Sequence, residues 1–150
     1  MAFWLMKSEP DTFGIDDLER ERRTSWEGVR NYQARNYLRD TVKRGDLAFL
    51  YHSSCPEPGI AGIMTVCRPA CPDPTQFERR SPYYDPASRP EAPRWFTVEM
   101  RWRRRLRRFI GLAELRACGG LDGLALLQPG NRLSVMPVAA QVWQRILDLE

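Results

Sequence analysis

The alternation of apolar and polar residues over positions 95–106 constrains the fold most. At a spacing of two, one face carries four apolar side chains, Phe96, Val98, Met100 and Trp102. The opposite face carries Trp95, Thr97, Glu99, Arg101 and Arg103. A period of two indicates a β-strand with one buried face. Residues 95–106 are therefore predicted to form a long, half-buried strand with a charged outer face.

Shorter segments with strand or helix patterns lie on both sides of this strand. Apolar runs predict strands at 3–6, 46–51, 60–67 and 132–136, and helical spacing predicts helices at 15–22, 31–42, 112–117 and 138–149. The strands follow one another without regular crossover helices, so an α+β fold around a bent, mixed sheet is expected. Five to seven curved strands favour a small β-barrel with flanking short helices, because closure removes exposed sheet edges.

Residues 69–93 hold more than half of the chain's 12 prolines. This density excludes a packed helix or a central strand, yet the segment also contains Phe77, Tyr83 and Tyr84, which a flexible linker does not need. We predict an ordered loop that lies over the fold and is not a domain boundary. A length of 150 residues is typical of one domain, so a single domain over 1–150 is expected.

The net charge of +4 conceals an uneven distribution of arginine. Lys7 and Lys43 are the only lysines among 23 basic residues, and six arginines lie within 101–108. The guanidinium group presents a planar fork of donors that suits phosphate, so an anionic polymer is a reasonable partner. A genome rich in G and C would produce the same bias, and the charge alone leaves that alternative open.

Cysteine content and hydropathy predict where such a chain works. The four cysteines are not accompanied by a secretory leader, which indicates reduced thiols and a cytoplasmic location. No apolar run reaches the roughly 18 residues that span a bilayer. We therefore expect no membrane association. We also expect a monomer.

Metal and hydrolase chemistry are both disfavoured by residue spacing. The pairs His52/Cys55 and Cys67/Cys71 resemble halves of a zinc site, but a strand at 60–66 would separate them by about 20 Å. His52 is the only histidine, and no nucleophile elbow or glycine-rich phosphate loop is present. We expect neither a metal nor a cofactor. An enzyme that uses His52 as a general base on a small molecule or nucleotide is kept as an alternative.

The segment Trp26–Asn31 groups an aromatic ring, a glycine, an arginine and an amide directly before a predicted helix. A ring and a bidentate amide fit stacking on a heterocycle and reading its edge, and the free N–H groups of a helix start attract anions. Core packing is the alternative for each aromatic residue.

Nine short motifs, in order along the chain, closely resemble the EVE domain family. They are Trp4-Leu-Met-Lys-Ser-Glu-Pro10, Trp26-Glu-Gly-Val-Arg-Asn-Tyr-Gln-Ala-Arg35, Gly45-Asp46, Tyr51-His-Ser-Ser-Cys55, Gly59-Ile-Ala-Gly62, Asp73-Pro74, Ser81-Pro-Tyr-Tyr-Asp85, Pro93-Arg-Trp95 and Asn131-Arg-Leu-Ser-Val135. The resemblance implies a PUA-like fold that binds nucleic acid with a modified base, modified cytosine in DNA being the expected class. It implies a pocket lined by Lys7, Ser8, Trp26, Arg30, Asn31, Tyr51, His52, Ser53, Arg94 and Trp95.

This resemblance predicts a protein that recognises a modified base without catalysis, and that binds the base in a pocket after it has flipped out of the stack. Arg101 and Arg103, on the outer face of the long predicted strand, are expected to hold neighbouring phosphates. An RNA-binding module of the PUA-like type is a further alternative. The sequence leaves open whether a nuclease or RNA-processing partner is involved.

Overall fold

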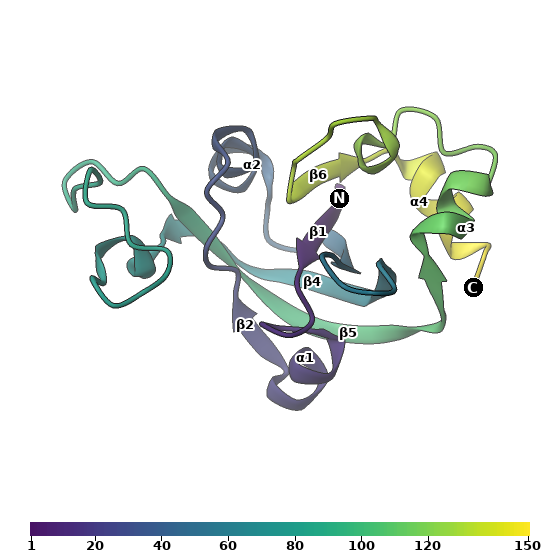
Figure 1. The fold of residues 1–150 in the computed structure, drawn as a ribbon, viewed down its shortest axis with the longest axis horizontal. Helices are drawn as coiled ribbons and strands as arrows, with labels where there is room; N and C mark the ends of the chain where they lie inside the picture. Colours follow the sequence, from purple (N-terminus) through teal and green to yellow (C-terminus); the bar gives the residue numbers. More distant parts are fainter.

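The computed structural model describes all 150 residues, arranged around one six-stranded mixed sheet (Figure 1). The strands are β1 (Phe3–Ser8), β2 (Arg23–Ser25), β3 (Leu47–His52), β4 (Gly59–Pro72), β5 (Phe96–Gly111) and β6 (Val135–Val138). Their order across the sheet is β2-β5-β4-β3-β1-β6, with β1 and β3 parallel and every other pair antiparallel. The predicted α+β class and bent mixed sheet are confirmed. The sheet does not close into a barrel, because β2 and β6 remain at its edges.

Four short helices flank the sheet: α1 (Ile15–Glu21), α2 (Tyr32–Asn36), α3 (Leu112–Ala117) and α4 (Ala140–Leu147). The first turn of α1 contains Asp16 and Asp17, and the Asp17 carboxylate accepts a hydrogen bond from the Gly14 N–H at 2.8 Å. The Asn31 side chain caps α2 by accepting from the Ala34 N–H at 3.0 Å. The single helix predicted over 31–42 is α2 followed by a π-helical turn, Tyr37–Thr41. None of the helices is long and apolar enough to cross a bilayer.

Strand β5 is longer and less regular than the alternation predicts. Val98 and Met100 are buried, and Arg101 and Arg103 are exposed, as expected. Thr97, predicted to lie outside, is only 2% exposed, and the Ser25 hydroxyl at the end of β2 contacts its own at 3.0 Å. The pairing of β4 with β5 shifts register four times, and in Figure 1 β5 curves beneath the other strands.

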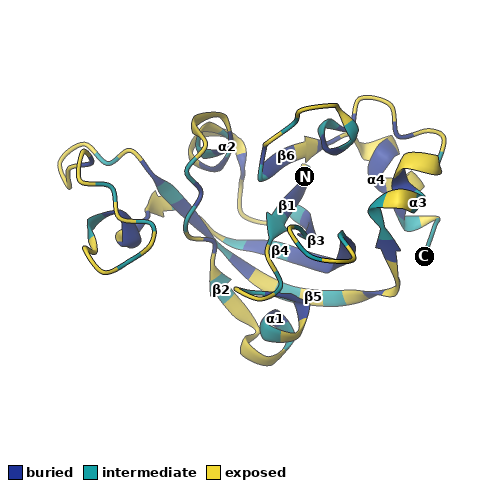
Figure 2. Ribbon diagram, in the orientation of Figure 1, coloured by how far each residue is buried: buried dark blue, intermediate teal, exposed yellow.

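One hydrophobic core joins the sheet to α4, and Figure 2 shows the buried residues concentrated along β3 and β4. The rings of Phe49 and Trp143 stack at 3.8 Å between centroids, and Phe3 stacks on Trp143 at 4.6 Å. At the other side of β1, the buried Asp46 carboxylate accepts from the Trp4 indole N–H at 3.0 Å.

The proline-rich segment 69–93 forms the distal part of β4 and an ordered loop that projects from one end of the sheet (left in Figure 1). Gln76, fully buried, ties this loop to the start of β5. Its amide NH₂ donates to the Asp73 and Trp95 carbonyls at 2.7 and 2.8 Å, and its amide oxygen accepts from Ser88 and the Trp95 N–H at 2.6 and 3.1 Å. The prediction of an ordered loop is confirmed, but the loop packs against residues 26–35 instead of covering the sheet.

Candidate functional site

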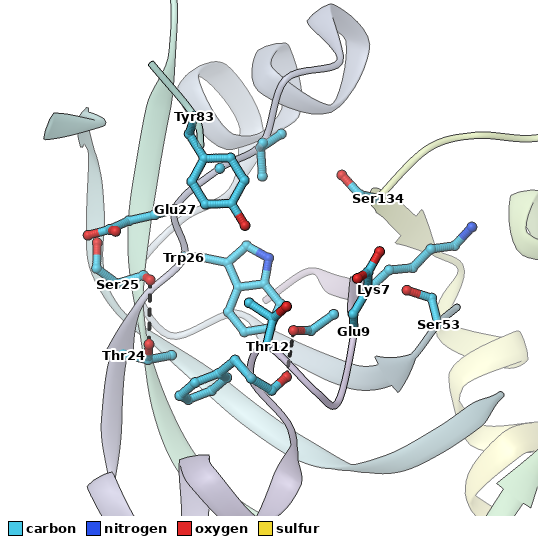
Figure 3. Close-up of a pocket in the computed structure, with 14 residues that line it drawn as sticks. Lys7, Glu9, Thr12, Thr24, Ser25, Trp26, Glu27, Ser53, Tyr83 and Ser134 are labelled. Atoms are coloured by element: carbon cyan, nitrogen blue, oxygen red, sulfur yellow. Dashed lines mark hydrogen bonds between the residues drawn. The ribbon is translucent and has the colours of Figure 1, made fainter. Parts of the chain in front are cut away.

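A cavity of about 680 Å³ opens where β1 and β3 end and the proline-rich loop approaches Trp26 (Figure 3). Its apolar wall consists of Phe13, Trp26, Val29 and Tyr83. Its remaining surface carries the hydroxyls of Ser8, Thr12, Thr24, Ser25, Ser53 and Ser134, the carboxylates of Glu9 and Glu27, and the amino group of Lys7. A cavity of this size, with an aromatic wall and scattered polar groups, suits a planar organic ligand.

Trp26 lies in the cavity wall, and its indole N–H makes no hydrogen bond within the protein. Its backbone N–H donates to the Val98 carbonyl at 2.8 Å, and its ring meets Phe13 edge-on at 6.4 Å between centroids. The indole N–H groups of Trp4 and Trp95 donate to aspartates at 3.0 and 2.7 Å, whereas the Trp26 indole N–H has no protein acceptor. The residue is only 6% exposed, but its indole N–H is not enclosed by the protein, so this donor is open to water or to a ligand.

Gly28 brings the Tyr83 ring against the backbone beside Trp26. The residue has a φ of +83°, and a Cβ there would lie 2.6 Å from the Tyr83 Cζ atom. Only glycine gives both the left-handed conformation and the close approach. The wall formed by Tyr83 therefore depends on the absence of a side chain at position 28.

We expect Gly28→Ala to displace Tyr83 and weaken ligand binding. A methyl group there collides with the ring and strains the backbone, so a loss of about 1–3 kcal/mol in folding stability should accompany it. Urea unfolding measures the loss of folding stability, and ligand titration measures the loss of binding. Gly123→Ala is the control, because Gly123 also has a positive φ, +84°, but open space around it. A loss of binding no larger than in that control would contradict this role for Gly28.

Arg30 positions Tyr83 and does not line the cavity. All five of its N–H donors are used: Nε and Nη2 donate to the Tyr83 carbonyl, Nη2 to Thr75, and Nη1 to the Val29 carbonyl and to Asp73, at 2.8 to 3.1 Å. Asp73, fully buried, also accepts from the Gly28 N–H at 2.9 Å. The guanidinium thus joins the proline-rich loop to the segment that carries Trp26, and it has no donor left for a ligand.

Trp95, Arg94 and Asn31, all predicted to face the ligand, lie outside the cavity lining. Trp95 is 5% exposed, stacks on Tyr32 at 4.9 Å between centroids and donates its indole N–H to Asp85. Arg94 is exposed, and its carbonyl accepts from Arg35 at 2.6 Å. The Asn31 amide oxygen is occupied as the cap of α2. These three residues act in the structure as supports of the loop and of α2.

Tyr51 and His52 also lie outside the cavity lining, although Ser53 directly after them belongs to it. Tyr51 is 3% exposed, and burial raises the pKa of its hydroxyl. His52 Nε2 accepts a hydrogen bond from the Ile15 N–H, at the start of α1, at 3.1 Å. This nitrogen must be unprotonated to accept, and its lone pair is already engaged.

The position of His52 predicts a specific acid sensitivity. Burial lowers the pKa of His52 from 6.5, while Asp16 raises it and Arg105 lowers it further. In the unfolded chain the imidazole takes up a proton at a higher pH than in the folded protein, so stability should fall as the pH drops below 6.5 toward the folded pKa. Urea unfolding of wild type and His52→Gln between about pH 7 and 5.5 checks this. Identical pH slopes in the two proteins would contradict it.

The arginines of β5 separate into two groups. Arg104 pairs with Glu150 at 2.6 Å, Arg105 with Asp16 and Glu19, and Arg108 with Glu114. Arg101 and Arg103 are exposed and make no ion pair. Of the six arginines at 101–108, three are thus held by carboxylates, while the two predicted to contact phosphate are free. No group of three or more His, Cys, Asp or Glu side chains in the structure could hold a metal ion.

Comparison with known proteins decides the family. The sequence model of the EVE domain matches residues 2–149. The chain belongs to the EVE domain family. Human thymocyte nuclear protein 1 is 44% identical to this EVE domain over 167 residues, which cover 99% of the chain and 74% of that protein.

Solved structures agree with this assignment. A crystal structure of a Pseudomonas syringae protein is 49% identical, with a TM-score of 0.96 and 99% of each chain covered. The human THYN1 protein in complex with 5-methylcytosine containing DNA is 43% identical, with a TM-score of 0.93, covering 99% of this EVE domain and 97% of that chain. A YTH domain from Zygosaccharomyces rouxii in complex with N6-methyladenosine RNA is 12% identical with a TM-score of 0.57, which shows a shared PUA-type fold alone.

Of the ten ligand contacts predicted from the sequence, four line the cavity of this EVE domain: Lys7, Ser8, Trp26 and Ser53. Their contact with a ligand stays a prediction. The prediction did not include Phe13, Tyr83 or Ser134, which also line the cavity. The motifs at 81–85 and 131–135 contain Tyr83 and Ser134 and were the available signal for both.

Proposed function

We propose that this EVE domain binds DNA that carries a modified cytosine and accommodates that base, extruded from the duplex, in the cavity beside Trp26. Two findings support the proposal. The cavity has an aromatic wall and several hydroxyls, and a relative 43% identical over nearly its whole length is the human THYN1 protein in complex with 5-methylcytosine containing DNA. Recognition here requires no change in the base.

The aromatic wall that Trp26 and Tyr83 form in the cavity is the observation that carries this proposal. Extruding a base costs a few kcal/mol, and stacking on an aromatic ring returns about 1–3 kcal/mol. The indole N–H and the hydroxyls of Thr12 and Ser53 offer hydrogen bonds to the edge of the base, and the rings of Trp26 and Tyr83 offer an apolar surface to a methyl group. The cavity thus rewards both the heterocycle and its modification.

The occupied lone pair of His52 argues for binding without catalysis. A general base must reach a proton on its substrate, whereas Nε2 of His52 accepts from the start of α1 and the residue lies outside the cavity lining. The alternative enzyme that uses His52 therefore has no support from the geometry. An RNA-binding module of the same fold is the other alternative, and its preference for RNA over DNA would distinguish it.

Fluorescence anisotropy with matched oligonucleotides tests the proposal. A duplex with one 5-methylcytosine should bind at least about fourfold more tightly than the unmodified duplex, because burying one methyl group contributes about 0.8 kcal/mol. Single-stranded RNA of the same sequence, with and without the methyl group, is the third arm. Equal affinity for the two DNA duplexes would contradict the proposal, and a preference for RNA would favour the RNA-binding alternative.

Binding should weaken with salt, and Arg101 and Arg103 should account for part of the slope. Removing one ionic interaction with a DNA phosphate makes the slope of log K against log salt shallower by about 0.9 for duplex DNA. Replacing both residues with alanine should therefore make the slope shallower by about 2 and leave the preference for methylcytosine unchanged. The Arg116→Ala/Arg145→Ala variant, on α3 and α4, is the control. An unchanged slope would exclude Arg101 and Arg103 from the interface.

A further inference from the structure

The end of the cavity away from Trp26 is built on three neighbouring strands. Lys7 lies on β1, Ser53 directly follows β3, and Ser134 directly precedes β6. Because β1 lies between β3 and β6, the backbone hydrogen bonds from the Lys7 N–H to the Ser134 carbonyl and from the Ser53 N–H to the Ser8 carbonyl, at 2.8 and 3.0 Å, place the three side chains side by side. Figure 3 shows them together, across the cavity from Trp26 and Tyr83.

None of these three side chains has a partner in the protein. The Lys7 amino group makes no hydrogen bond or ion pair, and the hydroxyls of Ser53 and Ser134 make no hydrogen bond, although all three residues are half-buried. The neighbouring Ser8 hydroxyl, in contrast, donates to the Phe13 carbonyl at 2.6 Å. The aliphatic part of a lysine can be buried while its amino group stays in contact with water, so the Lys7 amino group is accessible to a ligand. The cavity thus has a cation and two hydroxyl groups that have no hydrogen-bond or ion-pair partner in the protein.

Two carboxylates also line the cavity, and the one nearer Lys7, that of Glu9, lies beside it in Figure 3. Glu27 lies on the opposite side, next to Ser25, and Glu9 lines the cavity without an ion pair to Lys7. Burial lowers the pKa of the Lys7 amino group, and no carboxylate counteracts it. An oxyanion placed here would supply the ion-pair partner that Lys7 lacks and accept from both hydroxyls.

We propose that Lys7, Ser53 and Ser134 form an oxyanion subsite, which binds an acidic group carried by the nucleoside whose base contacts Trp26. This inference rests on the proposed function and extends it from the base to a second ligand group. Two sources supply such a group, the phosphate of the bound nucleotide and a carboxylate substituent on the base. The subsite makes the cavity bipartite, with aromatic rings at one end and a cation with hydroxyl donors at the other.

Lysine NMR gives a direct readout, because the chain has only two lysines. In protein labelled with ¹³C at the lysine ε-carbons, inorganic phosphate should shift the Lys7 signal and leave that of Lys43, which is exposed, in place. The two signals are assigned with Lys7→Met and Lys43→Met. Equal shifts at both lysines, or no shift at either, would overturn the subsite.

Calorimetric titration then compares 5-methyl-2′-deoxycytidine with its 5′-monophosphate and with 5-carboxy-2′-deoxycytidine. Wild type and Lys43→Met should bind at least one of the two acidic ligands about tenfold more tightly than the neutral nucleoside, and Lys7→Met should lose that gain while it still binds the neutral nucleoside. The ligand that shows the gain identifies the source of the oxyanion. Ser134→Ala should lose a smaller part of it.

The two proposals fail in different ways. If the neutral nucleoside binds and depends on Trp26, but neither acidic ligand gains affinity, the subsite is overturned and the proposed function stands. If phosphate moves the Lys7 signal while nucleosides show no dependence on Trp26, the three residues bind an oxyanion, but the proposed function fails and a nucleoside is not the source of the oxyanion. A Lys7→Met variant that weakens neutral and acidic ligands equally would also overturn the subsite.

Discussion

Replacing Trp26 with alanine is expected to weaken binding of a 5-methylcytosine duplex by about 5- to 150-fold, because base stacking contributes about 1–3 kcal/mol. The preference over the unmodified duplex should disappear with it. Trp26 supplies both a ring face and the unpaired indole N–H, and the loop around it is held by residues that do not touch the cavity. Anisotropy titration measures the effect.

Two variants separate recognition from packing at this position. Trp26→Phe keeps an aromatic ring and removes the indole N–H, so it should bind more weakly than wild type and more tightly than Trp26→Ala. Trp102→Phe, on β5 and outside the cavity lining, is the matched control and should bind as wild type does. If Trp26→Ala retains the methylcytosine preference, or if it unfolds, Trp26 belongs to the core and not to a binding site.

Asp73→Ala is expected to destabilise the protein by about 3–5 kcal/mol, since removing one member of a buried ion pair leaves the other charge uncompensated. The Asp73 carboxylate is fully buried and accepts from Arg30, from the Gly28 N–H and from the Thr75 N–H at 2.8 to 3.1 Å. Its loss also releases Tyr83 from its place in the cavity wall. Urea unfolding gives the change in free energy.

The control for this change is Asp122→Ala, since Asp122 is exposed and makes no ion pair or side-chain hydrogen bond. Surface substitutions of this kind stay within about 0.5 kcal/mol of wild type. A loss below about 1 kcal/mol in Asp73→Ala would show that the Arg30–Asp73 pair does not hold the loop. Asp73→Asn keeps the shape of the side chain and removes its charge. Its loss of stability should lie between those of Asp122→Ala and Asp73→Ala.

Local patterns in the sequence predicted most of the elements, which depend on periodicities within one segment. They did not predict the short strand β2, and they placed the last strand at 132–136 instead of Val135–Val138. The buried and exposed positions of Val98, Met100, Arg101 and Arg103 follow from the period of two along β5. The cap at Asn31 follows from the preference of its side chain for a helix start. Whether the sheet closes could not be predicted in the same way, because its curvature depends on register shifts between β4 and β5.

The site was only partly predictable because its walls meet across long separations in sequence. The residues next to Trp26 in the sequence indicated its role. Tyr83 lies beside it because Arg30 donates hydrogen bonds both to Tyr83 and to Asp73, and Arg30 and Asp73 are 43 residues apart. A sequence shows that Arg30 carries five donors but not that all five are used inside the protein. Likewise, Trp95 was predicted to contact the ligand, and that prediction was wrong because the fold stacks its ring on Tyr32 outside the cavity lining.

The structure of the protein crystallised with a duplex that contains a single 5-methylcytosine tests the central claim most directly. We predict that the methylated base has left the helical stack, that its ring faces Trp26 and Tyr83, and that the indole N–H donates to it. A complex in which the methylated base stays stacked inside the duplex, with the cavity free of nucleic acid, would contradict the account.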